Sequence, residues 1–556
     1  MTEKLRAMTS IWSNPVVVRD MRVRLRGPRA FWNQALYLGV LSLIALAGYA
    51  AAISASGSAV DPIQIQQSLA TFYFFIFLTV AGLILLIAPA LTAASVVFER
   101  QRLTLDLLVT SPMTSLQMLT GKLVSSVAFL LLLLSLSIPA SALCVMLGGA
   151  TIGDVFRIYV LLATDGIVLA AIGLLFSCTT KNSVQAISGT YGAVILFAIL
   201  TFVIGQTVEV SGVASHMRGA GAAPAPPLSA LVALNPFIAV TLTNFNVILI
   251  GASVPLWLVT AVFAVLIVRL LMTASALRLG LYEQGLVGSL RRQALLITAA
   301  TAFPTGQWVA TTTGLPSDLS VFFSVIGIGV GAFCVGSFFF PSLFVPVVDE
   351  EAPVLATIKH SYNLRAAFSK DHAGALPFFH IWLLVTLVAA ALGVALPEGT
   401  VASYVSMGMP HMGVPAKVTL IVLAIAVLTS FTYLSAAGYL LWCIARRAAT
   451  FCPSYTMARP ITYVIFVFIV AAPFAVMAVA SQLRNDFTDV FSSPFNVLWL
   501  GFPFSDMAMN GRPWVERISP FAWTSALAYA LGTLIYSPWL PVTPGIAAFA
   551  RRKVPA

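Results

Sequence analysis

Long apolar stretches, separated by shorter polar segments, run through most of the chain. Each carries few or no charged residues and is close to the length of about 20 residues that an α-helix needs to cross a membrane. They cover residues 35–54, 69–91, 123–146, 156–177, 186–206, 253–275, 320–344, 377–396, 418–443, 460–480 and 519–540. The stretch 294–312 is weaker because it contains Pro304, Gly306 and Gln307. The pattern predicts an all-α polytopic membrane protein with about twelve transmembrane helices.

The positions of Lys and Arg support counting residues 294–312 as a span. With this span and a cytoplasmic N-terminus, most of the 30 Lys and Arg residues fall on the cytoplasmic side, as the positive-inside rule favours. Without it, every later segment inverts and the basic residues of 359–370 and 446–459 move outside. We therefore expect a multi-pass protein of the cell membrane, such as the bacterial inner membrane, with both termini in the cytoplasm.

The composition strengthens this interpretation and excludes other classes. Hydrophobic residues make up 59% of the chain and charged residues only 9%, whereas soluble domains carry about 25% charged residues. The net charge of +11 is explained by cytoplasmic loops beside anionic membrane lipid, so no nucleic-acid partner is expected. The five cysteines form no C-x-x-C pair and have no His at zinc-finger spacing, which predicts no metal site.

An arginine-rich arm precedes the first span. Asn14 and Pro15 have the order of a helix cap and a first-turn proline, and Gly27-Pro28 ends the helix. An apolar stripe beside an arginine stripe is typical of a helix that lies in the membrane interface. The candidate residues of this arm are Asn14, Pro15, Arg19, Arg22, Arg26 and Arg29. The arm is either an anchor held by its charge or a docking helix for a cytoplasmic partner.

A second amphipathic segment, residues 99–115, lies between the second and third spans. It is too short and too charged to cross a membrane, and Pro112 ends its predicted helix. Gly121-Lys122 then opens the third span. An ordinary interfacial helix is the simpler of two explanations for this segment.

The other explanation is a resemblance. Over roughly residues 12–280, the arm and this segment together resemble the membrane permease subunits of ABC-2 type ABC transporters. The matching positions are Glu99, Arg100, Thr104, Leu105, Asp106, Leu107, Leu108, Ser111, Pro112, Met113, Thr114, Gly121 and Lys122. The family often has Gly where this chain has Leu103. The resemblance implies that residues 99–112 form a coupling helix for a cytoplasmic ATPase subunit, which would bind the ATP and Mg²⁺.

Little chemistry is expected within the chain itself. It contains no G-x-x-x-x-G-K-[ST] motif, so we expect no enzyme activity and no cofactor in this chain. Asp165 lies near the middle of the fourth span, where a carboxyl group is costly, and it is a candidate intramembrane polar site. The alternative is a structural carboxyl group.

Two short matches indicate an internal repeat. Residues 96–99 follow the second span, and residues 347–350 follow the eighth. The segment Asn235-Pro236-Phe237 precedes the sixth span, and Ser493-Pro494-Phe495 precedes the twelfth. They suggest two diverged six-helix halves, with the Pro-Phe segments expected to seal the exit side. The expected domains are the arm (1–30), a first half (31–280) and a second half (281–556).

These features predict a permease subunit that moves a hydrophobic or amphipathic substrate, such as a lipid, drug or peptide-like compound, outward with ATP hydrolysed by a partner. A second permease or auxiliary chain is a further candidate partner. One alternative is an ion-coupled twelve-helix secondary transporter, which usually needs several intramembrane ionisable residues. Another is a membrane glycosyltransferase with an acidic pair on the first outside loop, where this chain has only Asp61.

Overall fold

The computed structural model describes residues 15–25, 28–56, 62–103, 114–146, 150–217, 233–241, 246–249, 252–279, 286–313, 325–329, 332, 367–368, 375–395, 420–451 and 519–536. These residues are predominantly helical. The chain divides into two compact units, unit 1 over Met1–Ile297 and unit 2 over Thr298–Ala556.

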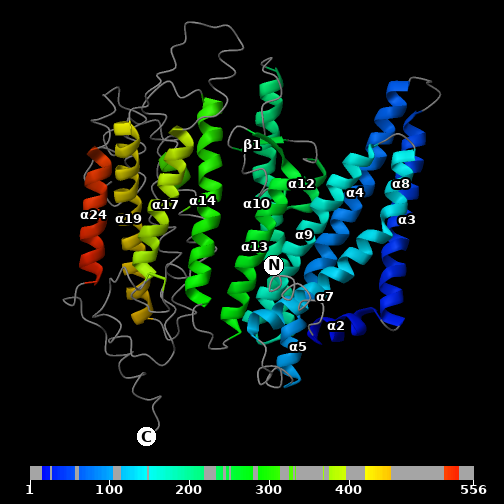
Figure 1. Cartoon of the computed structure of the whole chain (residues 1–556), viewed down its shortest axis with the longest axis horizontal. Coiled ribbons are helices and arrows are strands. Elements are labelled where there is room, and N and C mark those ends of the chain that lie inside the picture. The colour runs from blue at the N-terminus through cyan, green and yellow to red at the C-terminus, as the bar shows by residue number, and fades with distance from the viewer. Residues whose placement is uncertain are drawn as a thin grey trace, which may run out of the picture. The chain divides into compact units, whose positions relative to one another are not determined.

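Unit 1 is built around one central helix, α9. Its helices are α2 (Pro15–Leu25), α3 (Pro28–Ser56), α4 (Pro62–Ala93), α5 (Ser95–Gln101), α7 (Ser115–Leu136), α8 (Ile138–Met146), α9 (Ile152–Thr179), α10 (Ser183–Met217), α12 (Pro236–Thr241) and α13 (Leu256–Arg278). An antiparallel hairpin of β1 (Asn246–Leu249) and β2 (Ala252–Pro255) precedes α13. Helices α4, α7, α10 and α13 all pack on α9. Figure 1 shows the short α2 lying between α5 and the end of α3, beneath α7, on which it packs.

The described part of unit 2 contains three further long helices. They are α17 (Ala375–Ala395), α19 (Leu420–Phe451) and α24 (Ser519–Tyr536), and α19 packs on both of the others. The hydroxyl groups of Ser435 on α19 and Tyr529 on α24 lie 2.8 Å apart. Helix α14 (Leu286–Thr313) begins in unit 1, and its later turns pass Ala390 of α17 at the glycine Gly306.

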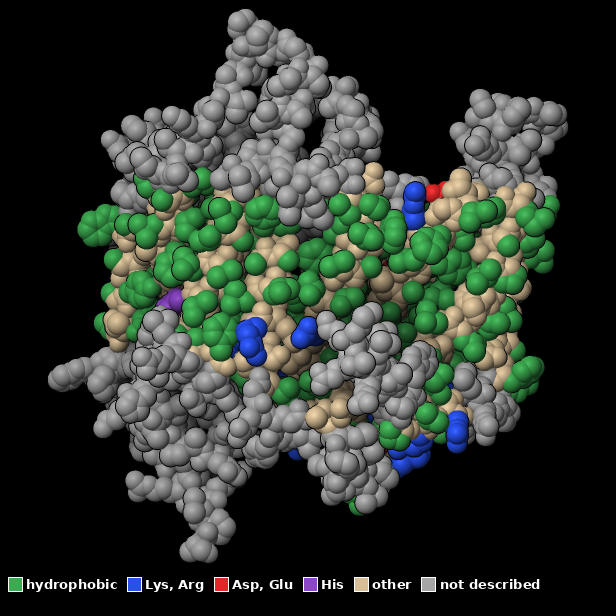
Figure 2. Space-filling view, viewed as in Figure 1, with side chains coloured by type: hydrophobic (Ala, Val, Ile, Leu, Met, Phe, Trp, Pro, Cys, Tyr) green, Lys and Arg blue, Asp and Glu red, His purple; other side chains and the backbone are tan. Residues whose placement is uncertain are grey.

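Among the described residues, seven helical segments are long and apolar enough to cross a membrane. They are Phe31–Ala50, Phe72–Gln101, Ser115–Leu143, Ile152–Thr179, Leu256–Arg278, Pro377–Val394 and Leu423–Leu441. Figure 2 shows hydrophobic side chains over most of the described surface between the helix ends. Leu43, Leu46 and Val265 are each about two-thirds exposed or more (69%, 71% and 68%), which is compatible with a multi-pass membrane protein.

The prediction of a helical chain with several membrane spans is therefore confirmed. Helices occupy most of the described residues of the predicted spans, and 294–312 falls within α14. Residues 253–255 of the predicted span 253–275 lie instead in β2, and the span 123–146 is divided between α7 and α8. Most of the predicted span 320–344 and all of 460–480 lie outside the described residues. The hairpin was not predicted, because its strands are short and apolar and β2 overlaps the predicted span 253–275.

Helices α4 and α9 approach each other closely in unit 1. Thr92 Oγ1 donates a hydrogen bond of 2.7 Å to the carbonyl oxygen of Ala170. At Gly173, an added methyl group would meet Thr92 and the backbone of Pro89. Small residues permit such backbone contact between membrane helices, where it is a main source of packing energy.

Candidate functional site

Contacts of α5 with α2, α7 and α9 join four helices of unit 1. Pro89 lies inside α4, whose helix ends at Ala93, and α5 begins at Ser95. The backbone amides of Val96 and Val97, in the first turn of α5, donate to Ser177 Oγ of α9 at 2.9 and 3.3 Å. First-turn amides have no partner within their own helix, so the serine satisfies them and fixes α5 to α9.

The guanidinium of Arg100 completes the attachment at the other end of α5. Arg100 Nη1 donates to the carbonyl oxygen of Thr180 at 2.9 Å, and Nη2 donates to that of Cys178 at 3.3 Å. The last carbonyl groups of a helix lack intrahelical partners and carry partial negative charge, so an arginine there stabilises the end of α9. Arg100, predicted as a coupling residue, thus has a structural contact of its own.

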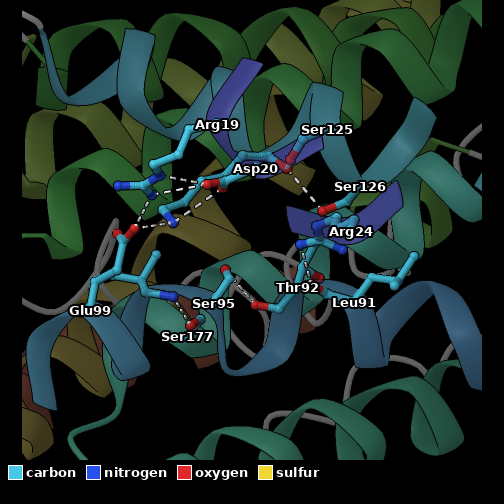
Figure 3. Close-up of polar contacts among 12 residues, drawn as sticks. Arg19, Asp20, Arg24, Leu91, Thr92, Ser95, Glu99, Ser125, Ser126 and Ser177 are labelled. Atoms are coloured by element: carbon cyan, nitrogen blue, oxygen red, sulfur yellow. Dashed lines mark hydrogen bonds and ion pairs between the residues drawn. The ribbon is translucent and has the colours of Figure 1, made fainter. Parts of the chain in front are cut away.

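Four charged residues from three elements meet beside α5, and we call Arg19, Asp20, Glu99 and Lys122 the charge cluster. Glu99 Oε1 lies 2.6 Å from Arg19 Nη2 and 2.8 Å from Lys122 Nζ. Asp20 lies 2.9 Å from Arg19 and 3.7 Å from Lys122. Figure 3 shows Arg19 and Glu99 pointing toward one another, with Asp20 beside Arg19. Helices α2, α5 and α7 are therefore joined by ion pairs.

Burial differs strongly within the charge cluster. The side chain of Lys122 is 3% exposed and that of Glu99 is 12% exposed, whereas Arg19 is 49% exposed. Partial burial opposes the charge of Arg19, but the hydrogen bond to Glu99 and the charge of Asp20 outweigh it and raise the pKa of Arg19. The Lys122–Glu99 pair is the buried centre of the cluster, where loss of one partner costs most.

A second arginine fixes α2 to α4. Arg24 Nη2 donates to the carbonyl oxygen of Leu91 at 2.8 Å, and burial lowers the pKa of this guanidinium despite the charge of Asp20. The apolar side of α2 is also covered, with Val16 and Val17 at 3% and 1% exposure. The arm is thus packed on its own chain, while Arg22 is exposed. Pro15 is the first residue of α2, as predicted, and Asn14 lies outside the described residues.

The predicted helix over residues 99–112 begins differently in the structure. Glu99 and Arg100 belong to the last turns of α5, which ends at Gln101. Leu103 has a φ of 55°, the left-handed conformation that glycine favours. Leu103 therefore holds a backbone conformation that glycine would adopt without strain.

Replacing Leu103 with Gly should stabilise the protein. A left-handed conformation costs an L-residue roughly 1–2 kcal/mol, and the extra freedom of glycine in the unfolded chain offsets part of the gain. We expect Leu103→Gly to raise the melting temperature in detergent, whereas Leu103→Val lowers it. Leu103→Ala is the control for loss of the side chain, and a stabilisation by Ala equal to that by Gly would contradict the explanation.

Several predicted residues lie outside the described part of the chain. They are Thr104, Leu105, Asp106, Leu107, Leu108, Ser111, Pro112, Arg26, Ser493, Pro494 and Phe495. The chain is described again from Thr114, whose side chain accepts from the amide of Gln117 at 3.2 Å at the start of α7. Arg29 lies in the first turn of α3.

The Asn235-Pro236-Phe237 segment forms the start of α12. Asn235 Nδ2 donates to Thr201 Oγ1 and to the carbonyl oxygen of Ala198, both on α10, at 2.9 and 3.0 Å. Its Oδ1 accepts from the amide of Phe237 at 3.1 Å, as an N-cap does. Phe237 packs against Gly82 of α4. These contacts give the segment a structural role, and its predicted sealing of an exit stays a prediction.

Asp165 lies on α9, fully buried at 0% exposure. Neither carboxylate oxygen has a hydrogen-bond partner among the described residues. An ionised carboxylate without a partner in an apolar interior is very costly. The surroundings therefore suit a neutral side chain.

Asp165→Asn should leave the protein folded, because an amide of the same shape replaces a carboxyl group that has no partner to lose. We expect a change in stability within about 1 kcal/mol, measured by thermal unfolding in detergent. Asp165→Lys should prevent stable folding, because an ammonium group there has no acceptor. Equal stability of the Lys and Asn variants would contradict the described burial.

Sequence reasoning missed the partners within the charge cluster. Asp20 and Lys122 were visible in the sequence, but no spacing indicates that α2 and α5, 80 residues apart, would meet. The contacts of Arg24 and Ser177 were missed for the same reason. The sequence did contain one indication for Asp20, because it is the single acidic residue of the arginine-rich helix α2.

No protein-family model, curated protein or solved structure matches this chain. Within the described ranges, no three His, Cys, Asp or Glu side chains gather in a way that could hold a metal ion.

Proposed function

We propose that the chain is the membrane-spanning permease subunit of an ABC transporter, driven by a separate cytoplasmic ATPase. In this proposal the end of unit 1 that carries the charge cluster faces the cytoplasm. Basic residues support that orientation: Arg22, Arg100 and Lys122 lie at this end, together with Lys181 after α9 and Arg278 at the end of α13. Arg157 lies near the start of α9, at its other end. The positive-inside rule favours such a distribution.

One observation carries the proposal. The segment 104–113, which matches the family's coupling motif, is bracketed by α5 and α7, and the Glu99–Lys122 ion pair of 2.8 Å joins these two helices. A force applied to the segment would therefore act on both helices together rather than on a loose loop.

Further contacts would transmit the force into the membrane. Arg19 joins α2 to α5, and Ser177 and Arg100 join α5 to α9. An ATPase that closes on the segment would move α2, α5, α7 and the end of α9 as one group. Twelve spans in two six-helix halves would then enclose the path of a hydrophobic or amphipathic substrate, which is moved outward.

The proposal is tested by purifying the full chain from its native membrane in mild detergent. We expect an ATP-binding polypeptide to co-purify, and the complex to hydrolyse Mg²⁺-ATP in proteoliposomes. Substituting Lys122→Met should lower this hydrolysis, while Arg157→Gln, at the other end of α9, should not.

An ion-coupled secondary transporter is the alternative, and buried Asp165 is the observation that favours it. In that case no ATPase would co-purify, and uptake of a lipophilic fluorescent dye into inside-out vesicles would stop on addition of an uncoupler with ATP intact. That pair of results would overturn the ABC proposal. Dye uptake that needs ATP and survives the uncoupler would support it.

A further inference from the structure

A cavity of about 450 Å³ lies in unit 1 between α7, α9, α13 and the first turns of α14. Its size falls within the range of roughly 300–1,000 Å³ that is usual for small-molecule sites. None of the four residues of the charge cluster lines it. It is therefore a separate feature of the same unit.

One end of the cavity is polar. Arg269 and Thr273 lie one turn apart on α13, and Ser289 and Gln293 lie one turn apart on α14. Thr273 Oγ1 lies 3.1 Å from Gln293 Oε1, and Gln293 Nε2 donates to Ser289 Oγ at 3.2 Å. The guanidinium of Arg269 is exposed and forms no ion pair with any described residue. This end thus offers one uncompensated positive charge beside neutral hydrogen-bonding groups.

The other end is apolar and opens onto the outer surface of α13. Ile167, Ala261 and Val265 line it. Val265 is 68% exposed, so the apolar lining continues onto the exposed face of the helix. A hydrocarbon chain can occupy such a surface without losing any polar contact.

The depth of Arg269 explains why a counter-charge is needed. It lies nine residues before Arg278, the last residue of α13, so it is about 14 Å along the helix axis from that end. An arginine at such depth in a membrane is costly unless it reaches the interface or finds a partner. The membrane itself supplies such an anion: the phosphate group of a lipid that is drawn toward the side chain.

We propose that this cavity binds an anionic phospholipid, with the phosphate against Arg269 and one acyl chain along Ala261 and Val265. Net negative charge is favoured because the site presents a single unpaired cation, whereas a zwitterionic headgroup brings a cation of its own. The site does not rest on the proposed ATPase partner.

The test uses the full chain in lipid nanodiscs with phosphatidylglycerol that carries a photoactivatable group in its acyl chain. Labelled peptides are mapped by mass spectrometry and compared with labelling by the matching phosphatidylcholine. We expect labelling of the peptides around Ile167 and Val265, with about a tenfold excess of phosphatidylglycerol. Arg269→Gln should remove most of this excess, and Arg269→Lys should keep most of it.

Two controls separate charge from shape. Arg292 is an exposed arginine near the polar end that does not line the cavity, so Arg292→Gln should leave the excess unchanged. Ala261→Phe fills the apolar end and should lower labelling by both lipids. The proposal would be overturned if both lipids label the natural protein equally, or if the excess of phosphatidylglycerol survives Arg269→Gln. It would also be overturned if inorganic phosphate abolishes labelling by both lipids equally. Because the assay contains no ATPase, its failure leaves the proposed transport function standing.

Discussion

Replacing Glu99 with Gln will destabilise the protein by about 3–5 kcal/mol, the usual cost of removing one partner from a buried ion pair. The loss is large because Lys122 is only 3% exposed and would be left with Asp20, at 3.7 Å, as its remaining acid partner in the charge cluster. Arg19 would lose its contact of 2.6 Å at the same time. Thermal unfolding in detergent will show a lower melting temperature for Glu99→Gln than for the natural protein.

Two variants separate the buried pair from the exposed one. Arg19→Gln removes a half-exposed arginine, and exposed ion pairs contribute about 0–1 kcal/mol, so its effect should be several times smaller. The double variant Glu99→Met with Lys122→Met removes both buried charges and should recover most of the lost stability. A double variant as unstable as Glu99→Gln alone would show that the ion pair is not the cause.

Replacing Gly173 with Val will separate α4 from α9 and reduce both stability and function. A side chain there meets Thr92 and the backbone of Pro89, and backbone cannot move aside as a flexible side chain does. Overpacking commonly costs about 1–3 kcal/mol, and we expect a result at or above the upper end of this range. The hydrogen bond of 2.7 Å from Thr92 to Ala170 should also be lost.

Gly192 on α10 provides the matched control. It lies in a helix as Gly173 does, but a methyl group there would meet nothing within 4 Å. Gly192→Val should change the free energy of unfolding, obtained from the melting temperature, by less than about 1 kcal/mol. Similar losses for the two variants would mean that valine itself, rather than the contact with α4, is responsible.

The helices of this protein were largely predictable because apolar length is a strong local signal. Charge-poor runs located α9, α13 and α17 within a few residues, and Pro15 marked the start of α2. The break between α4 and α5 was harder to predict, because Pro89 lies several residues before the end of its helix and the apolar run continues past it.

The candidate site was predictable only in part. The sequence indicated that Glu99 and Arg100 matter, through a motif, but not that one pairs with Lys122 and the other caps α9. Such pairings depend on how helices far apart in the sequence pack, which no local period encodes. The left-handed turn at Leu103 was equally hidden, because leucine gives no sign of a positive φ.

Photo-crosslinking from the end of α5 tests the central claim most directly. With p-benzoylphenylalanine at position 103, which is 75% exposed, irradiation of native membranes should link the chain to an ATP-binding polypeptide. Position 152 is 77% exposed at the opposite end of α9, about 40 Å along its axis from Thr179, and should give no such product. An ATP-binding polypeptide linked from position 152, or none linked from position 103, would contradict the account.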